Sequence, residues 1–562
     1  MHDLLIRQAQ VFDGSGADPV YADVAVSGGR IVDISRAGGP ARQIVQADGL
    51  ALMPGIVDLH THYDAQVTWD RTMSPSPALG VTTAVIGNCG FGIAPCPAPL
   101  RDTMLRNLSV VEGMDLNALR SGVDWQFESF AQYMDQLRAI GPYLNTAVFA
   151  GHSVIRTAVM GEDASSRAQA SESELAQMRA MVVDAMANGA IGFASSFSPN
   201  HSGYAGRPMP STIASHEELY ALTDVLGDVG KGIFMSATGA RLTPAQMEGI
   251  AQRTGRPAFI STVLAMYNEA NPGLCTSYYE ACRASLARGN PVYMLTNCQP
   301  LSFDFSLNDP YLLLSHGAFD AIAGLQGDAL AAVYRSQSFR EAFRANLASP
   351  GEGILFLGDW SRIQISRCLD PGMAGLTGLT MTELAAARQC DPLDAFFDVA
   401  LEDGLQTRFL ARLFQNDDAG VAPLLKDPAA VITLSDAGAH LLYLCDAGFG
   451  LHMLAHWVRE TGHFSLAEAV RRLTSEPAAR FRIPERGWLR EGAPADLLLF
   501  DPATVGVSPA IPVADLPGGG TRMVREPVGT HGVWVNGIQV HDGRDYTGLS
   551  KGPGKVLDRF DA

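Results

Sequence analysis

The sequence predicts an α/β fold built on a (β/α)8 TIM-like barrel, with short strands at both ends of the chain. Three observations favour it. Strand-like and helix-like segments alternate through the middle of the chain, as in parallel α/β barrels. Reactive side chains follow several predicted strands, where barrel enzymes carry their chemistry. The length of 562 residues suits one large barrel plus a smaller domain.

The eight barrel strands are predicted from apolar, β-rich runs bounded by turn residues. They are placed near residues 54–60, 81–88, 145–151, 189–194, 231–236, 257–262, 291–296 and 430–435. Between the third and fourth strands, residues 171–187 read as a helix that begins at the capping sequence Ser171-Glu172-Ser173-Glu174. His60, Cys89, His152 and Asp436 all fall at or just after a predicted strand end.

Both chain ends read as short strands, and one connection is unusually long. The terminal strands are predicted at 4–8, 22–27, 30–35, 496–500, 532–535 and 538–541, with hairpin turns at Gly28-Gly29 and Asn536-Gly537. Residues 297–429 join the seventh barrel strand to the eighth and contain helix-like runs at 341–347, 381–389 and 393–401. This insertion is interpreted either as a lid over the active site or as a purely structural helical subdomain.

Composition excludes several classes of function. Hydrophobic residues make up 47% and charged residues 18%, as in ordinary globular proteins. The net charge of −18 argues against binding nucleic acid. We expect no signal peptide and no membrane span. Eight scattered cysteines do not form a disulfide framework, which favours a reducing cytoplasm.

The first predicted barrel strand ends in a His-x-His pair. In Asp58-Leu59-His60-Thr61-His62, the two histidines follow the apolar run at 55–59. Side chains two residues apart on a strand point to the same side, so His60 and His62 can bind one metal ion together. Neutral imidazole is a good ligand for zinc-like cations.

Three further motifs accompany this pair. They are Gly87-Asn88-Cys89-Gly90-Phe91-Gly92 after the second strand, Leu434-Ser435-Asp436-Ala437-Gly438-Ala439-His440 after the last, and Gly492-Ala493-Pro494-Ala495-Asp496-Leu497 beyond the barrel. With the His-x-His pair, they resemble the amidohydrolase superfamily and, within it, the N-acyl-D-amino-acid deacylase (D-aminoacylase) family. The resemblance runs from about residue 4 to the C-terminus.

The resemblance implies a domain plan and a metal site. The plan has a small β-sandwich from residues 1–52 and 485–562 beside a metal-dependent barrel at 53–484. The metal ligands would be His60, His62, Cys89 and Asp436, and a thiolate with imidazoles favours Zn²⁺. Asp58, Asp64 and His440 would support these ligands from behind.

The sequence departs from family members that carry a second metal. They have histidines after strands five and six, where this chain has Ser236-Ala237-Thr238 and Ser261-Thr262-Val263. No lysine ends strand four. We therefore expect one divalent ion at most.

The expected chemistry is hydrolysis of an amide bond by metal-activated water. Asp436 would act as general base and then general acid. His152, His201 and Tyr204 are candidate donors to the developing oxyanion, and Arg156 is a candidate substrate-binding cation.

The expected substrate is a small molecule, by default an N-acyl-D-amino acid, and a homo-oligomer is compatible with the family. Three of the family's recognition residues are missing. The lysine beyond strand six is absent, Phe197 replaces a tyrosine, and Cys445-Asp446-Ala447-Gly448 stands where many members have His-Pro-Arg. Arg207, Arg362 or Arg459 could also pair with a carboxylate. The alternatives are hydrolysis of a cyclic amide, imide or lactone, and a non-catalytic binding protein on a retained barrel.

Overall fold

The computed structural model describes residues 1–35, 38–262, 266–351, 354–443 and 446–560. These residues form two compact units, one from 1–299 with 417–562 and one from 300–416. Within the described residues, no helix is both long enough and apolar enough to cross a bilayer. The predicted division into a sandwich at 1–52 and 485–562 and a barrel at 53–484 stays a prediction.

The larger unit contains the predicted parallel barrel sheet, in which eight strands follow one another in chain order. The strands are β6 (Ile56–Asp58), β7 (Val81–Ile86), β8 (Asn145–Gly151), β9 (Gly192–Ser196), β10 (Ile233–Ala237), β11 (Ala258–Ile260), β12 (Val292–Thr296) and β16 (Ala430–Ile432). Every residue in them is buried, which explains why they read as continuous apolar runs. The predicted fold class is confirmed.

Contacts between the ends of the first and last strands complete the barrel. The backbone N–H of Asp436 donates to the carbonyl of His60 at 3.1 Å, and the N–H of His62 donates to the carbonyl of Ala437 at 2.7 Å. Below them, the N–H of Leu59 donates to the hydroxyl of Thr433 at 2.7 Å. The His-x-His pair and Asp436 are therefore neighbours even though 374 residues separate His62 from Asp436.

The helices that connect the strands begin at recognisable caps. The helix α5 (Glu172–Ala187) starts at Ser171, whose hydroxyl accepts from the N–H of Glu174 while the Glu174 side chain accepts from the N–H of Ser171. This is the predicted capping box. The turn after it includes Gly189, so β9 begins at Gly192, three residues later than predicted.

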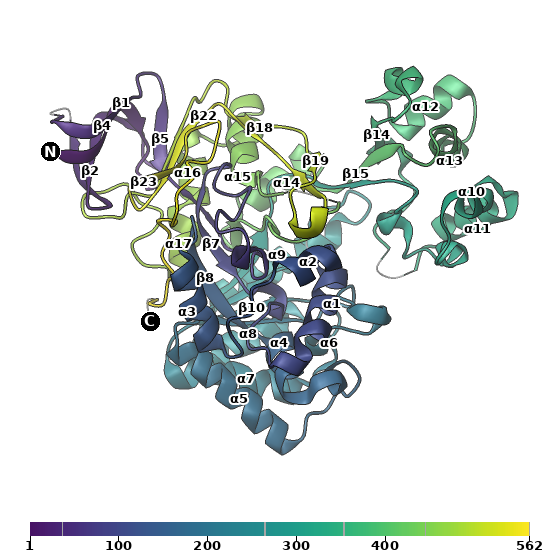
Figure 1. Cartoon of the computed structure of the whole chain (residues 1–562), viewed down its shortest axis with the longest axis horizontal. Helices are drawn as coiled ribbons and strands as arrows, with labels where there is room; N and C mark the ends of the chain where they lie inside the picture. Colours follow the sequence, from purple (N-terminus) through teal and green to yellow (C-terminus); the bar gives the residue numbers. More distant parts are fainter. Residues whose placement is uncertain (36–37, 263–265, 352–353, 444–445, 561–562) are drawn as a thin grey trace. The chain divides into compact units, whose positions relative to one another are not determined.

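The second sheet of the larger unit joins the two ends of the chain. Its order is β23 (Ile538–His541), β22 (Thr530–Val535), β17 (Leu497–Phe500), β5 (Ala51–Pro54), β1 (His2–Val11), β2 (Val20–Ser27) and β3 (Arg30–Ser35), with β4 (Ala41–Gln46) on β1. The purple N-terminal and yellow C-terminal strands lie side by side in Figure 1. Pro54 ends β5 in this sheet, so the predicted barrel strand 54–60 starts two residues too early.

The smaller unit contains the three predicted helices, namely α11 (Gln337–Ala348), α12 (Met381–Arg388) and α13 (Pro392–Glu402). It also contains an antiparallel sheet that the sequence analysis missed, in the order β13 (Leu301–Phe305), β15 (Arg408–Phe414), β14 (Ile363–Arg367). The alternation of Leu301, Phe303 and Phe305 with polar residues is the signal that could have found it.

Candidate metal centre

The predicted ligands meet at the carboxyl ends of β6, β7 and β16. Ligand atoms of His60, His62 and Cys89 all lie within 4.8 Å of one another, and this is the one such group of His, Cys, Asp and Glu among the described residues. The Sγ of Cys89 is 3.5 Å from Nε2 of His60. Oδ1 of Asp436 lies 3.2 Å from Nε2 of His60 and 3.6 Å from Nε2 of His62. Both histidines therefore present Nε2 to one small volume.

Cys89 reaches this volume because the chain turns sharply after β7. Its backbone has φ 55° and ψ 7°, in the left-handed region that non-glycine residues seldom adopt. The Asn88 side chain holds the turn by donating to the carbonyls of Val85 at 2.7 Å and Thr61 at 3.1 Å. Gly90 follows with φ +73°, and an added Cβ there would lie 2.7 Å from the Ala194 carbonyl. Glycine is thus required beside Cys89.

The loop after β16 is strained in the same way. Positive φ angles among non-glycine residues of the cavity occur at Cys89, Leu434, Asp436 and His440. Strained backbone gathers at functional sites, where the surrounding structure compensates for it. Gly438, also at positive φ, lets this loop lie against the backbone of His62.

Each histidine is held from behind through Nδ1. The Nδ1 of His60 lies 3.1 Å from the hydroxyl of Ser261, at the end of β11. The Nδ1 of His62 lies 3.1 Å from Oε1 of Glu112, and both side chains are buried. A partner on the second ring nitrogen fixes the tautomer and orientation of a metal-binding histidine.

Glu112 is a site residue that the sequence analysis missed. It directly follows a helix, α1 (Arg101–Val111), rather than a strand, so a prediction based on strand ends does not include it. The available signal was a single acid between apolar neighbours in Val110-Val111-Glu112-Gly113-Met114. Such an acid is expected to be buried with a partner.

The two aspartates expected behind the ligands have different roles. The Oδ2 of Asp64 accepts from the N–H of Gly87 at 3.0 Å and so supports the Cys89 turn. Asp58 does not touch an imidazole ring. It accepts from the hydroxyls of Ser435 and Thr433 and from the N–H of His60, and burial raises its pKa to about 7. Asp58 therefore braces the junction between the first and last strands.

Burial and charge set the pKa values of the cluster. Burial lowers the pKa of His60 to about 4, which leaves the ring neutral and its lone pair free. Burial acts the same way on His62, but Glu112, Asp436 and Cys89 together outweigh it and raise the His62 pKa well above the ordinary value. Burial raises the pKa of the Cys89 thiol to about 11. A cation binding here would displace protons from His62 and Cys89.

These residues line a cavity of about 90 Å³. The remaining described lining consists of Phe91, Val111, Glu112, Ser198, Asn200, His201, Ala237, Ser261, Thr262, Leu434 and His440. His201 is the one predicted substrate-binding residue that lines it. Ser261 and Thr262 occupy the strand-six position, and neither hydroxyl is a good zinc ligand. Val263 lies outside the described residues.

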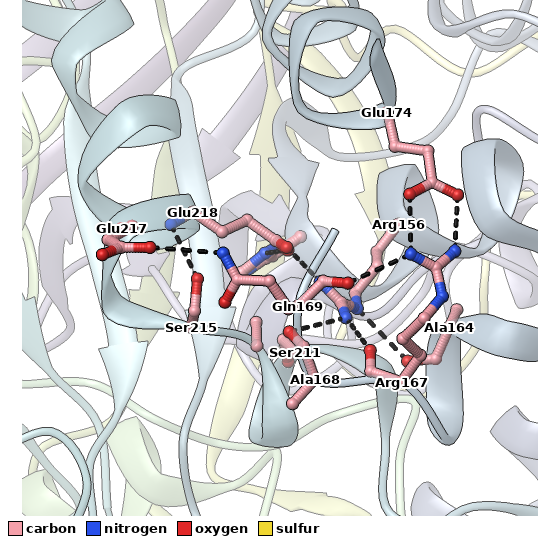
Figure 2. A network of polar contacts seen from close by, with 12 residues as sticks. Arg156, Ala164, Arg167, Ala168, Gln169, Glu174, Ser211, Ser215, Glu217 and Glu218 are labelled. Atoms are coloured by element: carbon pink, nitrogen blue, oxygen red, sulfur yellow. Dashed lines mark hydrogen bonds and ion pairs between the residues drawn. The ribbon is translucent and has the colours of Figure 1, made fainter. Parts of the chain in front are cut away.

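His152 and Arg156 are not in the cavity, contrary to the prediction. The His152 ring is fully buried, with Nδ1 2.8 Å from the hydroxyl of Ser195 and Nε2 2.8 Å from Oε1 of Glu218. The Arg156 guanidinium also pairs with Glu218 and donates to the carbonyls of 164, 167 and 168. Figure 2 shows the polar contacts of Arg156 and Glu218 within this network. The polar groups of His152, Arg156 and Glu218 are hydrogen-bonded within the network. We therefore interpret the network as structural.

Tyr204 and the other candidate cations also lie elsewhere. Tyr204 is exposed and stacks with the Arg106 guanidinium, 4.9 Å from the ring centre, beside a separate cavity. Arg207 lies 3.9 Å from Glu162, and Arg459 donates to the Val505 carbonyl. In the smaller unit, Arg362 pairs with Asp359 at 2.7 Å. Cys445 lies outside the described residues.

Comparison with protein families gives one match that covers most of the chain. The model of the amidohydrolase family, Amidohydro_3, matches residues 43–326 and 370–541.

Curated relatives match along nearly the whole length. The D-aminoacylase of Alcaligenes xylosoxydans xylosoxydans is 29% identical over 99% of this chain and 98% of its own. The N-acyl-D-aspartate deacylase of the same organism is 28% identical over 100% of this chain and 96% of its own.

Solved structures are similar in fold. A D-aminoacylase crystal structure superposes with a TM-score of 0.66 at 27% identity, and the match covers both chains fully. Another D-aminoacylase structure, with the same similarity, comes from work on a binuclear metal centre with one-metal activation and second-metal attenuation.

Proposed function

The chain belongs to the amidohydrolase family, and from that premise we propose that it hydrolyses the amide bond of N-acyl-D-amino acids with one divalent metal ion. It is a metal-dependent hydrolase of carbon–nitrogen bonds other than peptide bonds. The observation that carries the proposal is the convergence of His60, His62 and Cys89 within 4.8 Å, with Asp436 beside them.

The donor set fits a zinc ion. Two imidazoles with Nε2 turned inward, a thiol and a carboxylate are ligands that zinc accepts, whereas magnesium and calcium prefer oxygen. The strained backbone at Cys89 and Asp436 supports the same view, because it turns both side chains toward the histidines. The bound ion would act as a Lewis acid and lower the pKa of a water molecule to about 7.

The residues of the chain perform the remaining steps. His60, His62 and Cys89 hold the site, with Ser261 and Glu112 fixing the two rings. Asp436 accepts a proton from the attacking water as the new C–O bond forms. It then delivers that proton to the amide nitrogen as the C–N bond breaks, so that one water is consumed and a carboxylic acid and an amine are released.

Three further assignments accompany the function. We place the protein in a reducing cytoplasm, since the seven described cysteines are all free thiols. We assign a sandwich to 1–52 and 485–562 and a barrel to 53–484, with the 297–429 insertion as a lid or a structural subdomain. The expected partner is a small molecule.

One observation favours a second candidate substrate class. Among the described residues that line the cavity none is lysine or arginine, whereas Glu112 and Asp436 are both acids. The α-carboxylate of an N-acyl-D-amino acid would find no cationic side chain in this lining, and an unpaired buried carboxylate is costly. A neutral substrate, such as the α-carboxamide or a cyclic amide, avoids this penalty.

The test combines metal content with a paired substrate panel. We expect about one zinc per chain, lost in the His60→Ala/His62→Ala double variant, and cleavage of N-acetyl-D-leucine in preference to its L-enantiomer. N-acetyl-D-leucinamide tests the neutral class, and faster cleavage of it would select that class. Metal that survives the double variant, or a metal-loaded enzyme that cleaves no member of the panel, would refute the proposal.

A further inference from the structure

His201 lies on the connection after β9 and is held there by several contacts. Its ring packs edge-on against Phe91, with centroids 5.1 Å apart, and its Nδ1 is 2.6 Å from the hydroxyl of Ser196. The His201 carbonyl accepts from the N–H of Met209 at 3.1 Å. The ring therefore has a defined position in the wall of the cavity that contains His60, His62, Cys89 and Asp436.

The contacts of Ser196 favour one tautomer of His201. The hydroxyl oxygen of Ser196 already accepts from the N–H of Ser198 at 3.2 Å. The Ser196 hydroxyl lies 2.6 Å from Nδ1 of His201 and can donate its one proton there. With Nδ1 as the acceptor, a neutral His201 ring carries its proton on Nε2. Burial lowers the His201 pKa to about 4, so the ring is neutral near pH 7.

The other two donor candidates do not meet these conditions. Both ring nitrogens of His152 are used, by Ser195 and Glu218. Tyr204 lines a different cavity. Ser261 and Thr262 line the cavity, but the Ser261 hydroxyl is already bonded to His60.

We propose that His201 is a catalytic residue, which donates a hydrogen bond from Nε2–H to the oxygen of the scissile amide as that oxygen becomes an oxyanion. This inference rests on the proposed amide hydrolysis. When the water oxygen bonds to the carbonyl carbon, the C=O electron pair moves to the carbonyl oxygen. His201 stabilises that charge without transferring its proton, and the charge returns to the carbonyl as the C–N bond breaks.

The mechanism predicts a loss in kcat rather than in substrate binding. Removing one donor to an oxyanion lowers kcat by about 10²- to 10³-fold in characterised enzymes. We expect that loss in His201→Phe, with KM within a few-fold of wild type and metal content unchanged. His201→Gln keeps an N–H donor of similar reach and should recover part of kcat. Ser196→Ala, which frees the tautomer, should give a smaller loss.

The assays use the metal-loaded full chain and defined probes. Hydrolysis is measured with N-acetyl-D-leucine and N-acetyl-D-leucinamide, and binding with a methylphosphonyl derivative of D-leucine, whose tetrahedral phosphorus mimics the oxyanion. His201→Phe should weaken the phosphonyl probe by about the factor lost in kcat. As a matched control, His456→Phe alters a histidine paired with Asp418, outside the cavity, and should leave kcat unchanged.

Each outcome separates the two proposals. Unchanged kcat in metal-loaded His201→Phe would overturn the role of His201 but leave the proposed hydrolase activity standing. The same conclusion follows if kcat falls in His440→Phe instead. Loss of metal from His201→Phe would make His201 a support of the metal centre. If wild type cleaves neither substrate, the proposed function fails. If wild type and His201→Phe bind the phosphonyl probe with equal affinity, the role of His201 as hydrogen-bond donor is also overturned.

Discussion

The molecule contains two buried carboxylate–histidine pairs, which differ in what the second ring nitrogen of the histidine contacts. In the first, Glu112 lies 3.1 Å from Nδ1 of His62, whose Nε2 faces Asp436. In the second, Glu218 lies 2.8 Å from Nε2 of His152, whose Nδ1 is taken by Ser195. All four side chains are buried.

The difference shows how a binding histidine is distinguished from a structural one. Both histidines follow a barrel strand, and both were candidates on that ground. His62 keeps one nitrogen directed at other ligand atoms, whereas His152 has none to spare. Glu218 is further neutralised by Arg156, so the second pair is closed on itself. A position at a strand end therefore makes a histidine a candidate metal ligand. Whether its second ring nitrogen faces other ligand atoms distinguishes a binding histidine from a structural one.

The largest effect is expected when the two histidines are exchanged for alanine in turn. His62→Ala removes a ligand, so we expect loss of the metal and a fall in kcat/KM of at least about 10³-fold, since metal activation contributes several kcal/mol to the barrier. His152→Ala should keep the metal and lose stability instead. Metal analysis and kinetics on both variants provide the check. Equal metal loss in His62→Ala and His152→Ala would show that the two histidines do not differ as a ligand and a structural residue.

The sequence predicted the barrel, and it pointed to the four proposed ligands, because both sets of signals are local. Fully buried parallel strands are continuous apolar runs, and the ligands follow them directly. The pair His60 and His62 is indicated by its spacing on one strand. Cys89 and Asp436 were assigned as ligands by the resemblance of their motifs, which also follow strands, to the family.

The supporting residues could not be predicted in the same way, because their partners are distant in sequence. Glu112 lies 50 residues from His62, and Glu218 lies 66 residues from His152. The pairing with Glu218 is what holds His152 in its structural position, and the sequence does not show it. The antiparallel sheet of the smaller unit was missed for a related reason, since β13 pairs with β15 across about a hundred residues.

The second pair should matter for stability. Glu218→Gln leaves the Arg156 guanidinium buried without a carboxylate, and breaking a buried ion pair costs about 3–5 kcal/mol. The carbonyls of 164, 167 and 168 still accept from Arg156, so we expect the lower end of that range. The urea midpoint at pH 7 should fall while the metal content stays the same. An unchanged midpoint would show that the carbonyls alone satisfy Arg156.

The same variant carries a pH signature. Burial alone would raise the pKa of Glu218, but His152 and Arg156 outweigh it and hold the pKa below the ordinary value. A carboxylate with a lowered pKa stabilises the fold above its unfolded pKa of about 4.3, and that contribution is lost as the pH falls through the folded value. The difference in urea midpoint between wild type and Glu218→Gln should therefore be constant above pH ~5 and shrink in more acidic buffers. A difference that grows toward acid would have the wrong sign.

The smallest effect is expected at the first pair, where the carboxylate supports a ligand. Glu112→Gln keeps the shape of the side chain but removes the charge that orients His62 and makes it more basic. Loss of such a partner weakens metal affinity by about 10- to 100-fold. Competition with a chromophoric zinc chelator measures this directly, and Glu162→Gln, an exposed change near Arg207, serves as the matched control. Among the described residues His62 is the one ion-pair partner of Glu112, and no arginine depends on it. The urea midpoint of the metal-free protein should therefore fall less than in Glu218→Gln. If Glu112→Gln instead unfolds the chain and leaves the zinc affinity of the folded fraction unchanged, the two pairs are alike. The distinction based on the Nε2 of His62, which faces other ligand atoms, is then wrong.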